Sequence, residues 1–204
     1  GSWSTAGGLS VLGGTLTLGG SFTTAGLNLP AFHRTDGIVA LAGVLDNHDA
    51  ELNLNDTTGA WLLAGGTISG GALKLSESRM LVTTAAGGTL DEVTLVDDLT
   101  LEAGNAFVKN GLTLSDCQIL LQSVDGQAGP APRLYFQGTQ SISGTGTIRL
   151  GDGPAGQAAI EFGGIYDPSV YTLESNISIR GSGYIRYSTL VNNGAIIADD
   201  AGKN

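Results

Sequence analysis

Short apolar stretches alternate with polar corners along the whole chain, and a glycine-led phrase recurs between them. In residues 15–18 and 51–55 every second residue is a leucine, which is the period of two that marks a half-buried strand. The recurring phrase is a glycine followed by one or two residues and an aliphatic side chain, at intervals of about 22 to 23 residues: Gly43-Val44-Leu45, Gly66-Thr67-Ile68, Gly88-Thr89-Leu90 and Gly111-Leu112-Thr113-Leu114. This period predicts a solenoid, in which each repeat is too small to bury its apolar face alone.

The spacing of the turn residues predicts short strands throughout. Gly, Asn, Asp and Ser separate apolar runs of three to five residues, so no window is long enough for an amphipathic helix. Glycine allows a sharp turn at a corner and a close approach between stacked strands. We therefore expect an all-β, single-domain parallel β-helix over residues 1–204, with about eight or nine coils of about three strands each and almost no helix.

The repeat is interrupted by a polar segment rich in Gly and Pro at residues 122–132, and residues 151–156 form a second excursion of the same kind. The next glycine-led phrase, Gly146-Thr147-Ile148, comes 35 residues after Gly111. We interpret residues 122–132 as a loop insertion at a corner, which is either an ordinary surface excursion or part of a binding face. Gly1 and Ser2 resemble a scar left by removal of a tag, which suggests that the chain is a piece of a longer protein.

Composition narrows the classes of partner. The 204 residues include 33 Gly and 9 Lys and Arg, and the formal net charge is −10. Scattered bases on an acidic chain disfavour nucleic acid and anionic membrane surfaces as partners. The sequence contains no run of 18 apolar residues, so it predicts no membrane-spanning helix. The single cysteine, Cys117, excludes an internal disulfide, and we expect it to be a small buried hydrophobe.

Three segments carry a resemblance to known proteins. Residues 61–71, Gly111-Leu112-Thr113-Leu114 and residues 190–196 look like repeats of very large bacterial surface and secreted proteins. The chain thus resembles the adhesin-like parallel β-helix proteins of the pectin-lyase-like superfold, over nearly its whole length and through low-specificity Gly, Thr and Leu patterns. The resemblance implies a right-handed β-helix and an extracellular or cell-surface location. It transfers no catalytic residue.

Acidic side chains raise the alternative of an enzyme acting on polysaccharides. Several lie within one expected coil, with Glu77 about one coil earlier and Lys74 and Arg79 nearby. The acids of that coil are Asp91, Glu92, Asp97, Asp98 and Glu102. Such carboxylates could hold Ca²⁺ or serve in glycoside hydrolysis, but we favour a solvated acidic face with a few surface salt bridges. We assign no catalytic, cofactor or metal residue, and His33 and His48 lack a nucleophile phrase around them.

The second part of the chain differs in its surface chemistry, since all five Tyr lie after residue 126. Strand alternation predicts one inward set: Leu134, Phe136, Ile177, Ile179 and Ile185. It predicts an outward set that includes Ser178 and the candidate ligand or partner surface: Arg133, Tyr135, Arg180, Tyr184 and Arg186. Exposed Tyr and Arg suit a site that stacks on sugars or anchors a protein. The alternative is that these aromatic residues pack loops onto the strands.

The expected function is that of a non-catalytic structural and adhesive segment. A stack of strands would form a rigid spacer, and its side faces would bind a glycan or another surface protein. Two alternatives remain open at this point: a lyase or hydrolase of the same fold, and end-to-end self-association into an extracellular fibre. The latter is expected because residues 190–199 form a strand, turn and strand unit without a polar cap.

Overall fold

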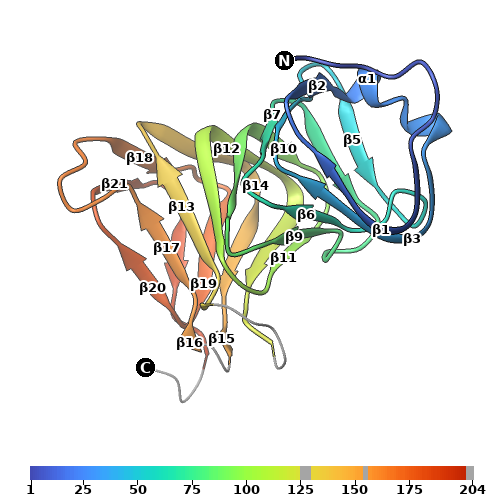
Figure 1. The fold of residues 1–204 in the computed structure, drawn as a ribbon. Coiled ribbons are helices and arrows are strands. Elements are labelled where there is room, and N and C mark those ends of the chain that lie inside the picture. The colour runs from blue at the N-terminus through green and yellow to red at the C-terminus, as the bar shows by residue number, and fades with distance from the viewer. Residues whose placement is uncertain (125–129, 154–155, 201–204) are drawn as a thin grey trace.

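The protein is nearly all β in a computed structural model that describes residues 1–124, 130–153 and 156–200. Its helical segments are α1 (Thr24–Leu27) and the 3-10 helix η1 (Leu29–Ala31). Thr23 caps α1, because its hydroxyl accepts a hydrogen bond from the Gly26 N–H at 2.9 Å. The prediction of an all-β chain with almost no helix is confirmed (Figure 1).

Most strands are short, as the turn residues predicted; the longer ones are β1, β3, β10, β12 and β14, with eight residues or more each. Their bounds are β1 (Ser10–Leu18), β2 (Ser21–Thr23), β3 (His33–Leu41), β4 (Val44–Asp46), β5 (Glu51–Leu54), β6 (Trp61–Leu63), β7 (Thr67–Ser69), β8 (Ala72–Leu75), β9 (Leu81–Thr83), β10 (Gly88–Leu95), β11 (Leu99–Leu101), β12 (Asn105–Leu121), β13 (Arg133–Gln137), β14 (Gln140–Leu150), β15 (Asp152–Gly153), β16 (Gly156–Gln157), β17 (Ala159–Phe162), β18 (Val170–Leu173), β19 (Ile177–Gly181), β20 (Tyr184–Arg186), β21 (Thr189–Asn192) and β22 (Ala195–Ile197). Within the described residues every strand pairing is parallel except the β15–β16 hairpin.

The parallel pairings form three rows, which the chain visits in turn. Row 1 runs β2-β4-β7-β10-β12-β13-β17-β20. Row 2 runs β5-β8-β10-β12-β14-β18-β21. Row 3 holds β1-β3-β6-β9 and then β11-β12-β14-β19-β22. Strands β10, β12 and β14 bend at corners and therefore contribute to more than one row, with register shifts after Asp91 and Ser115.

Residues in register form columns along each row, and the columns that point inward make the core. In row 1 the inward column is apolar and buried at every described rung: Phe22, Leu45, Ile68, Leu90, Val108, Phe136 and Phe162. Alternation along a strand places the neighbouring residues on the outside. The outward column of row 1 reads Ser21, Val44, Thr67, Thr89, Phe107, Tyr135, Glu161 and Arg186.

The glycine-led phrase marks a corner where the chain turns and then packs closely. Gly65 has a φ of 87°, which favours glycine. A Cβ on Gly66 would lie 2.6 Å from the carbonyl oxygen of Leu41, so no side chain fits there. The fourth phrase was aligned wrongly, because Gly88 pairs with Ala106 and not with Gly111. The interval along row 1 changes from 22 residues between Thr67 and Thr89 to 18 between Thr89 and Phe107.

The segment predicted as a loop insertion lies partly outside the described residues, which omit 125–129. Its described end packs against the strands: Ala131 is buried, and the Gly104 N–H donates to the carbonyl oxygen of Pro130 at 3.2 Å. The insertion lengthens the interval along row 1 to 28 residues between Phe107 and Tyr135.

The two ends of the rows differ. At one end α1 and η1 cover the core, and Leu27 and Phe32 are buried there (Figure 1). At the other end Ile185 continues a second inward column of row 1, which runs through Ala106, Leu134 and Ile160. The predicted inward positions of Leu134, Phe136, Ile177 and Ile179 are confirmed. Ile185 lies on the inward side, as alternation predicts, but 36% of it is exposed because no described strand packs beyond β20.

Candidate functional site

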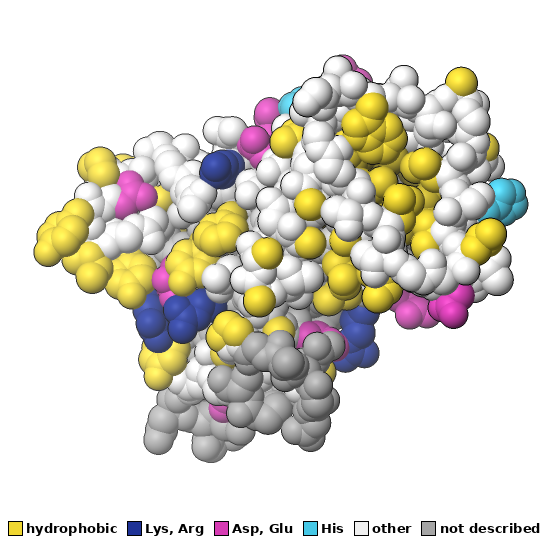
Figure 2. Space-filling view, viewed as in Figure 1, with side chains coloured by type: hydrophobic (Ala, Val, Ile, Leu, Met, Phe, Trp, Pro, Cys, Tyr) yellow, Lys and Arg dark blue, Asp and Glu magenta, His cyan; other side chains and the backbone are white. Residues whose placement is uncertain are grey.

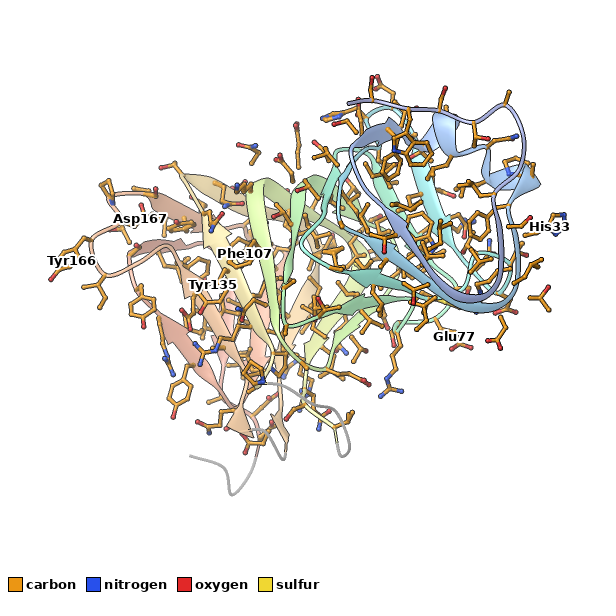
Figure 3. All side chains as sticks on the ribbon, in the orientation of Figure 1. His33, Glu77, Phe107, Tyr135, Tyr166 and Asp167 are labelled. Atoms are coloured by element: carbon orange, nitrogen blue, oxygen red, sulfur yellow. The ribbon has the colours of Figure 1, made fainter. Side chains whose placement is uncertain are left out.

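Six side chains from β12, β13, β17 and β20 make a mixed aromatic and charged surface on row 1. We call it the aromatic–arginine face, and it consists of Phe107, Arg133, Tyr135, Glu161, Tyr184 and Arg186. Two adjacent outward columns supply these residues. Phe107 and Tyr135 lie side by side in Figure 3, and Figure 2 shows Lys and Arg beside hydrophobic side chains over β17 and β20.

The aromatic part of this face is a stacked pair. The rings of Phe107 and Tyr135 have centroids 5.4 Å apart and an interplanar angle of 28°. Register pairing brings them together, since Phe107 on β12 and Tyr135 on β13 are directly opposed. Stacked pairs at this distance contribute about 0.5 to 1.5 kcal/mol beyond their burial. The pair is therefore a firm, partly exposed apolar platform.

Arg133 links the aromatic pair to Glu161. Its Nη1 donates to the Tyr135 hydroxyl at 3.3 Å and to Glu161 Oε1 at 2.9 Å. Only 4% of the Glu161 side chain is exposed, so its charge is neutralised largely by Arg133. The hydrogen bond to Tyr135, with the nearby Glu161 carboxylate, raises the pKa of Arg133 further above its already high value. Arg133 thus stays charged and holds the Tyr135 hydroxyl in place.

Arg186 supplies the net charge of the face. Its guanidinium carbon lies 4.3 Å from the centroid of the Tyr184 ring, a cation–π distance. Within the part of the chain that the structure describes, Arg186 makes no ion pair. Because Arg133 and Glu161 offset each other, the face carries one positive charge on a chain whose formal net charge is −10.

The structure brings together four of the five residues predicted for a ligand or partner surface. Arg133, Tyr135, Tyr184 and Arg186 lie on row 1. Arg180 lies on β19 in row 3 and binds Asp199.

Other predicted outward residues and tyrosines have separate roles. Ser178 points outward and shares a 2.8 Å hydrogen bond with Thr147. The alternative of loop packing holds for Tyr171, which is buried and donates to Asp167 at 2.9 Å. Tyr166 is 96% exposed at the tip of the loop beyond Asp167 (Figure 3). The tyrosines therefore do not form one site.

The acids considered for Ca²⁺ or for glycoside chemistry mostly have local partners. Asp97 accepts from the Leu75 N–H at 3.0 Å and Asp98 from the Gln118 N–H at 2.8 Å. Asp91 accepts from the Asn110 amide at 2.6 Å, and Glu102 pairs with Arg79. Among the described residues no group of three or more His, Cys, Asp or Glu could hold a metal ion.

The same region contains the other groups considered for chemistry. Lys74 pairs with Glu51 at 3.8 Å. Cys117 is buried, as predicted, and its thiol donates to the Leu95 carbonyl oxygen at 3.2 Å. Burial raises the pKa of Cys117 to about 11, so the thiol is not an activated nucleophile. His48 lies in a polar corner, where its Nδ1–H donates to Asp46 Oδ1 at 2.7 Å and its Nε2 lies 3.8 Å from Glu92 Oε2.

Two residues of the aromatic–arginine face were missed from the sequence. Glu161 is a lone acid in the otherwise apolar strand β17, and alternation with Ile160 and Phe162 would have placed it outside. Phe107 alternates with Ala106 and Val108 in the same way. Its partner Tyr135 lies across the loop insertion, so the constant period hid their contact.

Comparisons with protein-family models, curated proteins and solved structures find no match to this chain. Among the described residues, no helix has the length and apolar character needed to span a membrane.

Proposed function

We propose that this chain is a right-handed parallel β-helix that serves as a rigid, non-catalytic structural and adhesive segment of an extracellular or cell-surface bacterial protein. The three rows of parallel strands, visited in turn, support the β-helix. Right-handed crossovers between parallel strands are the strong general preference. The resemblance to adhesin-like repeats supports the extracellular setting.

The recognition surface of this segment is the aromatic–arginine face, and its ligand is a saccharide. The observation that carries this assignment is the outward column of row 1, which changes from Thr67 and Thr89 to Phe107 and Tyr135. Aromatic rings with an apolar face and a polar edge suit the stacking of sugar rings. Arg186 adds donors for hydroxyl groups beside that platform.

A glycan array probed with the purified chain tests this function. Tyr135→Ala and Arg186→Ala are expected to weaken binding roughly tenfold or more each, the size of a moderate hot-spot contact. Thr89→Ala is the matched control, since it lies in the same outward column two rungs before Tyr135, and binding should be unchanged. Binding that survives both face variants, or no binding to any glycan, would overturn the proposal.

The enzyme alternative is separated by assaying the glycans that bind. Lyase activity would appear as an unsaturated product that absorbs in the ultraviolet, and hydrolase activity as new reducing ends. Binding without turnover supports the adhesive segment. Turnover that is lost in Glu161→Gln would instead assign a catalytic role to the only carboxylate on the face.

End-to-end self-association is a second candidate, favoured by the open end of the rows. Strands β20, β21 and β22 each pair on one side only among the described residues, and Ile185, Val191 and Ile196 are exposed there. Unpaired strand edges are templates for pairing with another chain. Light scattering at rising protein concentration tests this, and a monomer at every concentration would exclude the fibre.

A further inference from the structure

Row 3 carries two arginines, Arg149 and Arg180, that lie side by side on adjacent strands. Arg149 on β14 and Arg180 on β19 are directly opposed in register, in an outward column between Leu120 and Ile197. Opposed residues of adjacent strands are only about 5 Å apart, and like charges in that arrangement are destabilising. A negative group shared by both guanidinium groups would offset this repulsion.

The chain supplies that group from the residues that follow β22. We call Asp199 and Asp200 the acidic strap. Asp199 bridges the pair, with Oδ2 accepting from Arg180 Nε at 2.9 Å and Oδ1 lying 3.7 Å from Arg149 Nη1. Asp200 Oδ1 accepts from Arg149 Nη2 at 2.5 Å. Asp199 thus contacts Arg180 on β19 most closely, and Asp200 contacts Arg149 on the adjacent strand β14.

The strap also secures a weakly held strand. Among the described residues, β22 pairs only with β19, through three opposed residues. Its side chains contribute little burial, because Ile196 and Ile197 are both exposed. The two arginines are themselves 36% and 42% exposed, so each ion pair is worth only about 0.2 to 1 kcal/mol. The strap is accordingly held weakly enough to be displaced.

We propose that Arg149 and Arg180 form a binding site for acidic peptides with two adjacent carboxylates, and that the acidic strap occupies this site in cis. Planar guanidinium groups suit carboxylates because each offers parallel N–H donors. The spacing of the pair along the row matches neighbouring residues of an extended peptide, as Asp199 and Asp200 demonstrate. A competing peptide would release the strap and leave β22 without its ionic contact. The site is separate from the aromatic–arginine face and independent of saccharide binding.

The test uses the full chain and a labelled, end-capped peptide with the sequence of residues 195–200, Ala-Ile-Ile-Ala-Asp-Asp. The cis strap competes at an effective concentration on the order of millimolar. We therefore expect a D199N/D200N variant to bind the peptide with a half-saturating concentration at least tenfold below that of the wild type. The same variant carrying R149Q/R180Q should lose this binding, as should a peptide ending in Asn-Asn.

Equal affinity of the wild type and D199N/D200N, absence of binding to D199N/D200N, or binding that persists in R149Q/R180Q would each overturn the proposal. Circular dichroism establishes that each variant is folded. Hydrogen exchange on the wild type provides a second measurement that needs no substitution. Millimolar Asp-Asp peptide should raise the exchange rate of the Ala195–Ile197 amides severalfold and Asn-Asn peptide should not; unchanged exchange with both peptides would contradict a displaceable strap.

Discussion

The outward column of row 1 has two halves that share a backbone and differ in chemistry. Its first half holds Ser21, Val44, Thr67 and Thr89, which are small side chains in register on successive strands. Its second half holds Phe107, Tyr135, Glu161 and Arg186. Parallel pairing fixes the backbone of both halves in the same way. The difference shows that the rows provide a scaffold and that the residues added to it set what the surface can bind.

The inward side changes together with the outward side. One inward column of row 1 holds Gly66 and Gly88 in the first half. In the second half the same column holds Ala106, Leu134 and Ile160. The core of the second half also contains an aromatic chain, since Phe136 contacts Phe162 and Phe162 contacts Tyr171, each with ring centroids 5.2 Å apart. The second half therefore depends on large side chains where the first depends on close backbone approach.

The largest expected effect is at Phe136. Phe136→Ala removes a fully buried ring between Val108 and Phe162, and we expect a loss of about 3 to 5 kcal/mol in the free energy of unfolding. Ile68→Val, at the same inward column in the first half, should cost about 0.5 to 1.5 kcal/mol. Urea unfolding monitored by circular dichroism measures both. A loss below that of Ile68→Val would show that the aromatic chain is not a cooperative part of the core.

The next effect tests close backbone approach in the first half. Gly66→Ala places a Cβ within 2.6 Å of the Leu41 carbonyl oxygen, and overpacking of this kind costs about 1 to 3 kcal/mol. Gly19→Ala is the matched control, because nothing lies within 4 Å of its Cβ position. Chemical unfolding of both variants measures the loss in the free energy of unfolding. Equal stability of the two would mean that adjacent strands separate readily at this corner.

Much of the fold could be predicted from the sequence, because period-two alternation and glycine corners report directly on strands and on close packing. The first three glycine-led phrases are in register. The fourth is not, since Gly111 follows a corner and shares only the composition of the phrase. Pair contacts such as Phe107 with Tyr135 depend on register across an insertion, which no local pattern encodes. Ile185 was placed correctly by alternation, and its exposure depends on what lies beyond the strand.

An effect of similar size is expected at Glu161, where the second half buries a charge. Glu161→Ala leaves Arg133 without its carboxylate, but Arg133 is 36% exposed and can be hydrated. We therefore expect a loss of about 1 to 3 kcal/mol rather than the larger cost of a fully buried ion. Thr89→Ala in the same column should change stability by less than about 0.5 kcal/mol. A double-mutant cycle with Arg133→Ala should give a favourable coupling energy between the two side chains. A coupling energy of zero would contradict the ion pair.

The smallest effect is expected in the first half, at the polar corner where His48 lies beside Asp46 and Glu92. The hydrogen bond that His48 donates to the Asp46 carboxylate, with Glu92 nearby, raises the pKa of His48 above its usual value. A group whose pKa is higher in the folded state adds stability below its unfolded pKa of about 6.5, and that contribution is lost as pH rises through the folded value. The wild type should therefore be more stable than Asp46→Asn at pH about 5.5, with the difference shrinking toward pH about 8. Thermal unfolding across this range measures the difference, and NMR titration of the His48 ring measures its pKa. A His48 pKa that is the same in Asp46→Asn would mean that the corner charges do not interact, and the halves would then differ only on their faces.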